Sequence, residues 1–179
     1  MAKTNEPIDY WTVIDEAFDK VDIYSGARAY LKQIGKYPPH VRHLLAAHWC
    51  QSEICNGGID QLVLNSTGVL APEGVEGLEA IGMPKTAAVL QKAIAQFGSR
   101  YPRDRVLRRA RWLGLRRSSG KANEGYGRAF ARLDTRFYAA MSAEGGFDER
   151  ANAYATDAAN SAKRPSDAKA PGKRPRTKR

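Results

Sequence analysis

The sequence has few cysteines and no long apolar run. Its 179 residues include two cysteines, Cys50 and Cys55, which lie five positions apart in a helical-looking run. They therefore point to different sides of one helix, and we expect no disulfide between them. No stretch reaches the about 18 apolar residues that typically span a bilayer, and residues 1–7 lack the apolar region of a signal peptide. The sequence thus predicts a cytoplasmic protein without membrane association.

Catalytic motifs are scarce as well. No glycine pair is followed by the Gly-Lys-Ser/Thr of a phosphate-binding loop. Glu53 has no second carboxylate placed beside it for acid–base chemistry. The base nearest in sequence to the cysteines, His48, is two positions from Cys50, a spacing that does not share a helical face. We therefore expect no enzyme activity and no cofactor, with an uncharacterised enzyme or metal protein as an alternative.

Histidines and cysteines cluster in one segment, which raises the question of a zinc site. They are His40, His43, His48, Cys50 and Cys55. Structural zinc requires four converging ligands. On one helix, His43 shares a face with Cys50. His48 shares a different face with Cys55, so the two pairs do not converge on one ion, and we expect no metal.

Positive charge is confined to two segments. The net charge is +10, but residues 1–99 carry 8 basic and 11 acidic side chains. Residues 100–139 carry 12 basic and 3 acidic side chains, and residues 163–179 carry 8 basic and 1 acidic. Such asymmetry is typical of proteins that contact polyanions or acidic protein surfaces.

Helical periodicity runs along most of the chain. Apolar spacing, with proline and glycine at the boundaries, predicts helices at 7–24, 27–34, 39–55, 59–64, 74–82, 85–97, 103–117 and 121–142. A strand competes only at residues 62–64. The fold class is therefore all-α, a single compact multi-helix domain over residues 1–145. The pattern decays after about residue 144, and the later residues are too poor in apolar side chains to fold, so we predict a disordered basic tail over residues 146–179.

A sharp corner is predicted between the helices at 39–55 and 59–64. Asn56-Gly57-Gly58 supplies residues that reach positive φ at low cost, which a helix needs in order to end and turn. Helical spacing places Glu53 on one face with Asn56, and Gln61 on one face with Asn65. We expect these polar side chains to form a network that stabilises the corner.

The segment around this corner resembles the helical domain family found at the C-terminus of a DNA-mimic protein, a domain of unknown function. The resemblance rests on a motif of six residues, with a structural role expected for each: Glu53, Asn56, Gly57, Gly58, Gln61 and Asn65. It continues weakly through residues 78–82, 85–97 and 133–138, and covers roughly residues 10–140. Where the family usually has aromatic residues after the glycines, this chain has Ile59, Leu62 and Val63.

The resemblance implies an all-helical domain which, in the DNA-mimic protein, binds a DNA-binding protein in place of DNA. DNA mimicry requires carboxylates arrayed like phosphates, whereas basic residues predominate here. The candidate remnant is an acidic stripe on the first helix, formed by Asp15, Asp19 and Asp22. The alternative is an ordinary solvated helix face.

The basic helix at 103–117 is the more informative segment. Its expected apolar, inward side consists of Val106, Leu107, Ala110 and Leu113. Its expected outward side consists of Arg105, Arg108, Arg109 and Arg116, with Trp112 among them. Guanidinium groups around an exposed indole suit phosphate contact with base stacking, or an acidic protein patch. The alternative is that Trp112 packs on another helix and the arginines are merely solvated.

The sequence thus favours a non-enzymatic protein-interaction module, with a DNA-binding regulator as the partner that the resemblance suggests. The alternative is direct nucleic-acid binding through the arginine-rich helix and the tail. The tail contributes Lys173, Arg174 and Arg176, whose attraction to nucleic acid is independent of base sequence. It could equally act as a solubility tail.

Overall fold

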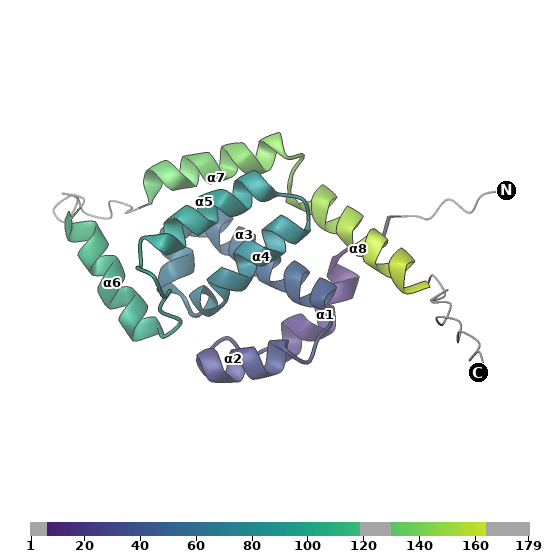
Figure 1. Cartoon of the computed structure of the whole chain (residues 1–179), viewed down its shortest axis with the longest axis horizontal. Helices are drawn as coiled ribbons and strands as arrows, with labels where there is room; N and C mark the ends of the chain where they lie inside the picture. Colours follow the sequence, from purple (N-terminus) through teal and green to yellow (C-terminus); the bar gives the residue numbers. More distant parts are fainter. Residues whose placement is uncertain (1–6, 119–129, 164–179) are drawn as a thin grey trace, which may run out of the picture.

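The computed structural model describes residues 7–118 and 130–163, and these form an all-α domain without strands (Figure 1). The all-α prediction is therefore confirmed. Within these two described segments, eight α-helices and one 3-10 helix follow one another: α1 Trp11–Lys20, α2 Ala27–Ile34, α3 Pro39–Leu64, η1 Ser66–Leu70, α4 Ala71–Ala80, α5 Pro84–Ala95, α6 Arg105–Ser118, α7 Ala131–Ala143 and α8 Phe147–Lys163. No helix in these segments is long and apolar enough to cross a membrane.

Helix α3 forms the centre of the domain. It contacts α1, α4, α6, α7 and α8, and Figure 1 shows α6 and α8 at opposite ends of the molecule. Its side chains are buried on several sides of the helix, because apolar residues lie nearly all round it. The strand alternative at residues 62–64 is wrong, because Leu62 and Val63 continue the buried surface of α3 in helical geometry.

The predicted corner is a kink within α3. Gly57 (φ −151°) and Gly58 (φ 79°, ψ −179°) leave helical geometry, and the helix then resumes. The N–H of Ile59, at the start of the second half, donates to Oδ1 of Asp134 at 2.8 Å. A carboxylate from α7 therefore caps the second half of α3.

Helix α7 caps a second helix in the same way. Glu144, which directly follows α7, accepts hydrogen bonds from the N–H groups of Lys85 and Thr86 at 2.8 and 3.0 Å. It also accepts one from the Thr86 hydroxyl at 2.7 Å. Burial opposes ionisation of this carboxyl, but the hydrogen bonds from Thr86 and Lys85 prevail and lower its pKa. The start of α5 is thus tied to the end of α7.

The predicted domain end at residue 145 is wrong, because α8 extends the fold to Lys163. Phe147, Ala151 and Ala155 lie four residues apart and are buried. Alanine at this spacing carries little hydrophobic signal, so sequence periodicity does not reveal the helix. The tail residues Lys173, Arg174 and Arg176 lie outside the described residues.

Two histidines of α3 anchor the N-terminal segment and α8. Nδ1 of His48 lies 3.1 Å from the hydroxyl of Tyr10, and Nδ1 of His43 lies 2.8 Å from the hydroxyl of Tyr154 on α8. The N–H of Tyr10 in turn donates to Oδ1 of Asn152 at 2.9 Å. Burial lowers the pKa of both histidines, with Arg42 adding to the effect on His43 and Asp148 opposing it on His48.

Stability is therefore expected to fall as the pH decreases through the ordinary histidine pKa of 6.5. In the unfolded chain these histidines take up protons near the ordinary pKa of 6.5. In the folded protein their pKa is lower, so they take up protons only at a lower pH. Protonation thus favours unfolding across this window. Urea denaturation at several pH values measures the effect. The double variant His43→Gln/His48→Gln should show a flatter profile, and an unchanged slope would contradict this origin.

Candidate partner-binding surface

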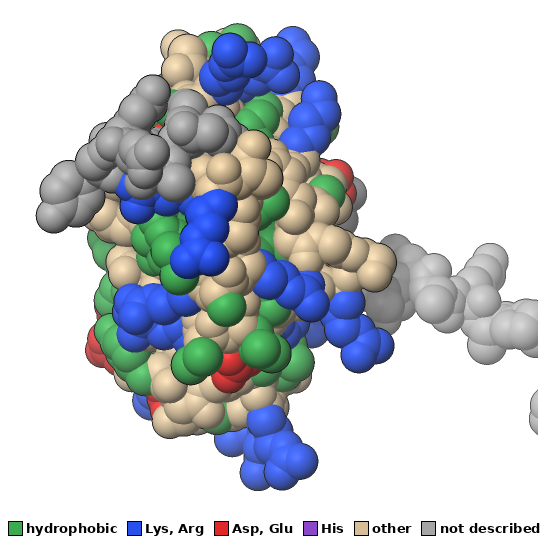
Figure 2. Space-filling model, turned by 90° about the vertical axis from the view of Figure 1, so that its left-hand side faces the viewer, with side chains coloured by type: hydrophobic (Ala, Val, Ile, Leu, Met, Phe, Trp, Pro, Cys, Tyr) green, Lys and Arg blue, Asp and Glu red, His purple; other side chains and the backbone are tan. Residues whose placement is uncertain are grey.

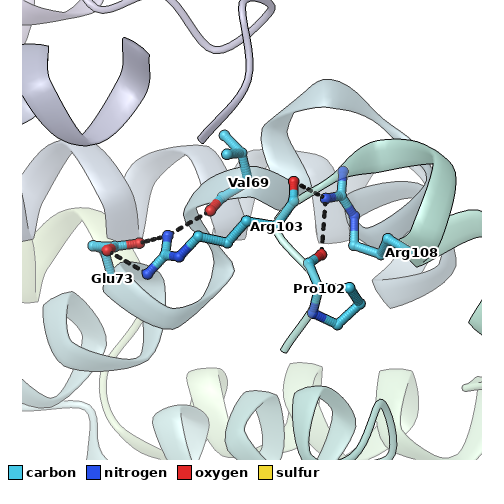
Figure 3. A network of polar contacts seen from close by, with 5 residues as sticks. All are labelled: Val69, Glu73, Pro102, Arg103 and Arg108. Carbon is cyan, nitrogen blue, oxygen red and sulfur yellow. Dashed lines mark hydrogen bonds and ion pairs between the residues drawn. The ribbon is translucent and has the colours of Figure 1, made fainter. Parts of the chain in front are cut away.

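Arg108 on α6 is fully buried, with an exposed fraction of 0%. Its guanidinium donates to four backbone carbonyls: Val63 (2.6 Å), Asn65 (2.7 Å), Arg103 (2.8 Å) and Pro102 (3.3 Å). Figure 3 shows two of these contacts, beside the paired hydrogen bonds of Arg103 to Glu73. The prediction that Arg108 lies on an exposed binding surface is therefore wrong.

The neighbouring arginines also contact the end of α3. Arg105 and Arg109 each donate through Nε to the carbonyl of Leu64, at 3.0 and 3.1 Å. The last carbonyls of a helix have no partner within it and carry partial negative charge. Three arginines of α6 thus cap the C-terminus of α3, which accounts for part of the basic composition in structural terms.

Helix α6 also contacts the segment that follows α5. Arg111 donates through Nη1 to the carbonyls of Phe97 and Arg100, just beyond α5. Helix α6 is therefore tied both to the end of α3 and to the loop after α5. The arginine side of α6 faces inward because these carbonyls need hydrogen-bond donors, which valine and leucine side chains lack.

Trp112 faces inward and is half-buried. Its indole N–H donates to Oδ1 of Asp60, a buried residue of α3. The guanidinium carbon of Arg116 lies 5.5 Å from the centre of the indole ring. The expectation that the indole of Trp112 faces outward for base stacking is therefore wrong. The alternative, that Trp112 packs against another helix, is confirmed.

The apolar side of α6 consequently faces solvent, opposite to the prediction. Val106 is 75% exposed, Leu107 is 59% exposed and Leu113 is 44% exposed. Together with the exposed Ala110 and Arg117, they form what we call the α6 outer face. Figure 2 views this end of the molecule and shows hydrophobic side chains interspersed with Lys and Arg, with few acidic ones.

The family motif forms a polar network at the kink of α3. Glu53 Oε2 accepts hydrogen bonds from Gln61 (2.7 Å) and Asn65 (3.0 Å), and Oε1 accepts one from the Thr67 hydroxyl (2.7 Å). The predicted contacts of Glu53 with Gln61 and Asn65 are confirmed. Thr67 was not predicted, because it lies beyond the helix in η1. Asn56 is exposed and is not among the donors to Glu53.

This network ties the two halves of α3 and η1 together, which supports a structural role for the motif. We expect Glu53→Gln to be tolerated, because glutamine can accept from Gln61 and Asn65 and donate to the Thr67 hydroxyl. Glu53→Leu should lower the free energy of unfolding by about 2 kcal/mol, since it leaves three donors without their acceptor. Urea denaturation of both variants measures the difference. Equal losses would show that the hydrogen bonds contribute nothing specific.

The acidic stripe does not form a uniform row. Asp15 and Asp19 are exposed on α1. Asp22 lies beyond the end of α1, where its Oδ1 accepts hydrogen bonds from the N–H groups of Tyr24 (2.7 Å) and Ser25 (3.1 Å). It therefore stabilises a local turn, and two carboxylates remain as the exposed part of the stripe.

The histidines and cysteines of α3 do not come together. Among the described residues, no group of three or more His, Cys, Asp or Glu side chains could hold a metal ion. Cys50 is buried and Cys55 is exposed, and both are free thiols. Burial raises the pKa of each thiol, although a hydrogen bond from Gln51 opposes this at Cys55. Neither cysteine thus has the lowered pKa of an activated nucleophile.

Comparison with known proteins identifies one family. The family model described as DMP19-like protein matches residues 35–158, which run from the end of α2 into α8. Neither the curated proteins nor the solved structures contain a match.

Proposed function

The chain belongs to the DMP19-like protein family, and from that premise we propose that it is a non-enzymatic protein-interaction module whose partner docks on the α6 outer face. The observation that carries this proposal is the exposure of Val106, Leu107 and Leu113 along one helix. Their partial burial by a partner would contribute about 25 cal/mol for each Å² of apolar surface removed from water. Exposed apolar side chains that share one face of a helix favour an interaction site.

We further propose that the partner is a DNA-binding regulator, as the family resemblance suggests. The contact does not require DNA mimicry. Asp15 and Asp19 are the exposed acids of the stripe, and they lie on α1 and not on the α6 outer face. The proposed docking is therefore apolar at its centre and cationic around it.

Site-specific photocrosslinking in cells tests this proposal. A photoreactive amino acid at Ala110, which is exposed on α6, should capture a defined protein. The same amino acid at Ala88, which is exposed on α5, is the matched control. The variant Val106→Ser/Leu113→Ser should lose the Ala110 product. Equal products at both positions, or none at Ala110, would overturn the proposal.

Direct nucleic-acid binding is the second candidate, favoured by the charge of residues 100–118, where eight arginines accompany one acid, Asp104. Gel retardation at increasing salt tests it, with the full chain compared with a chain ending at residue 163. Binding retained by the shorter chain and weakened by Arg117→Glu would support contact through α6. No retardation of DNA or RNA by either chain at low salt would exclude this function.

A further inference from the structure

We infer that the occupant of the α6 outer face is an amphipathic α-helix with acidic flanks, supplied by a different protein. This inference rests on the proposed function and gives the partner a chemical class. Three properties of α6 support it: the spacing of its exposed residues, its length and its charge.

The spacing of the exposed residues suits a second helix. Val106, Ala110, Leu113 and Arg117 are separated by four, three and four residues. Positions with this alternation form one narrow stripe along a helix, the pattern used when two helices pack side by side. Leu107 widens the stripe on one side. Helix α6 has 14 residues, and so presents a stripe about 21 Å long.

The charge beside the stripe selects an acidic partner. Arg105, Arg109 and Arg116 follow one another at four and seven residues, so they line one flank of the stripe. Arg105 and Arg109 are exposed but anchored through Nε on the carbonyl of Leu64. Anchoring reduces the conformational entropy that these side chains lose on binding. Carboxylates at helical spacing on a partner would meet them in register.

The acidic residue of this segment does not cancel that charge. Asp104 precedes α6, and its Oδ1 accepts a hydrogen bond from the N–H of Leu107 at 2.9 Å. It therefore serves as the N-terminal cap of α6 itself. The flank remains cationic along the length of the helix.

A second copy of this chain fits the surface poorly. Pairing two α6 helices would place arginine-rich flanks together, and like charges in contact oppose association. Pairing α6 with α1 of another copy would bring only the two exposed carboxylates of the acidic stripe, Asp15 and Asp19, to the three arginines of the flank. Nucleic acid offers no apolar stripe to cover Leu107 and Leu113. A foreign acidic helix satisfies both the apolar and the cationic parts.

Synthetic peptides test the inference with the full-length protein. Two fluorescent helical peptides of about 14 residues carry the same leucine stripe, one with glutamate flanks and one with lysine flanks. Fluorescence anisotropy should show the glutamate peptide binding at least about tenfold more tightly, with an affinity that falls as salt increases. Analytical ultracentrifugation should show the same oligomeric state for the protein and for Leu113→Ser, as expected if the α6 outer face is not a contact between copies.

Matched variants assign the binding to α6. Leu113→Ser should weaken the glutamate peptide, whereas Leu31→Ser on α2 should not, although the two leucines are similarly exposed at 44% and 43%. Arg117→Glu should weaken it, whereas Arg28→Glu on α2 should not. Circular dichroism confirms that each variant is folded.

The outcomes separate this inference from the proposed function. Equal binding of both peptides, lost in Leu113→Ser, would overturn the acidic partner but leave protein docking at α6 intact. Binding of neither peptide would overturn the inference, while the Ala110 crosslink decides the proposed function independently. Self-association that is lost in Leu113→Ser would identify a second copy as the occupant and would also overturn the inference.

Discussion

Replacing Arg108 with methionine is expected to lower the free energy of unfolding by about 3–5 kcal/mol. The side chain is completely buried and donates to four carbonyls, two of which, those of Val63 and Asn65, lie at the end of α3. Methionine fills much of the volume but donates no hydrogen bond, so the Val63 carbonyl would be buried without the donor that Arg108 supplies. The Asn65 carbonyl would keep only the hydrogen bond from the N–H of Gly68. Urea denaturation followed by circular dichroism measures the loss.

Arg109→Met provides the control for this variant. Arg109 is the next residue on α6, and it also donates to a carbonyl of α3, at 3.1 Å from Leu64. It is exposed, so water can replace the lost bond, and the expected loss is below about 1 kcal/mol. Similar losses for the two variants would mean that burial of Arg108 does not matter, contrary to the structure.

The Arg108→Met variant also tests whether the core contacts of α6 affect binding at the α6 outer face. Arg108 and Trp112 hold the inward side of α6 against α3, which is why Val106, Leu107 and Leu113 face solvent. We expect any folded Arg108→Met protein to present the α6 outer face less rigidly. Its affinity for an acidic helical peptide should therefore fall, although position 108 does not touch the surface.

Gly58→Ala is the second large expected effect, with a loss of about 3–4 kcal/mol. The backbone at this residue has φ 79° and ψ −179°, a conformation that side chains disfavour strongly. A Cβ atom would also lie 2.6 Å from Oδ2 of Asp134. Moving that carboxylate would weaken the cap on Ile59, so strain and a lost hydrogen bond combine.

Gly82→Ala separates the two causes. Gly82 has φ 82°, but a Cβ atom there would meet nothing within 4 Å. It should therefore cost only the backbone strain, about 1–2 kcal/mol. Gly57 differs from both, because its φ of −151° is open to any residue and its close neighbour is the side chain of Gln61. Equal losses for Gly58→Ala and Gly82→Ala would show that contact with Asp134 is unimportant.

Local signals were sufficient for much of the fold. Helix α2 occupies the predicted residues 27–34, between Gly26 and Gly35. The all-round apolarity of α3 and the glycine pair at its kink also follow from adjacent residues. The contacts of Glu53 with Gln61 and Asn65 were predictable because helical spacing alone determines which side chains share a face.

The first and last helices show where local signals fail. Helix α1 ends at Lys20, and not near residue 24 as predicted, because Asp22 and Gln33 bind the following backbone in a turn. Helix α8 was missed because its buried face is largely alanine. In both cases the decisive contact is made by a residue from another part of the chain or by a weakly hydrophobic side chain.

The helical class, the kink at Gly57-Gly58 and the basic composition of residues 100–118 follow from the order of the amino acids alone. The side of α6 that faces inward depends instead on how α6 packs against α3. Hydrophobicity favours burial of Val106 and Leu107, but the end of α3 and the loop after α5 present carbonyls that require donors, and Arg108 and Arg111 supply them. Unpaired buried carbonyls cost more than exposed aliphatic side chains. That balance involves residues more than 40 positions apart, so no local pattern contains it.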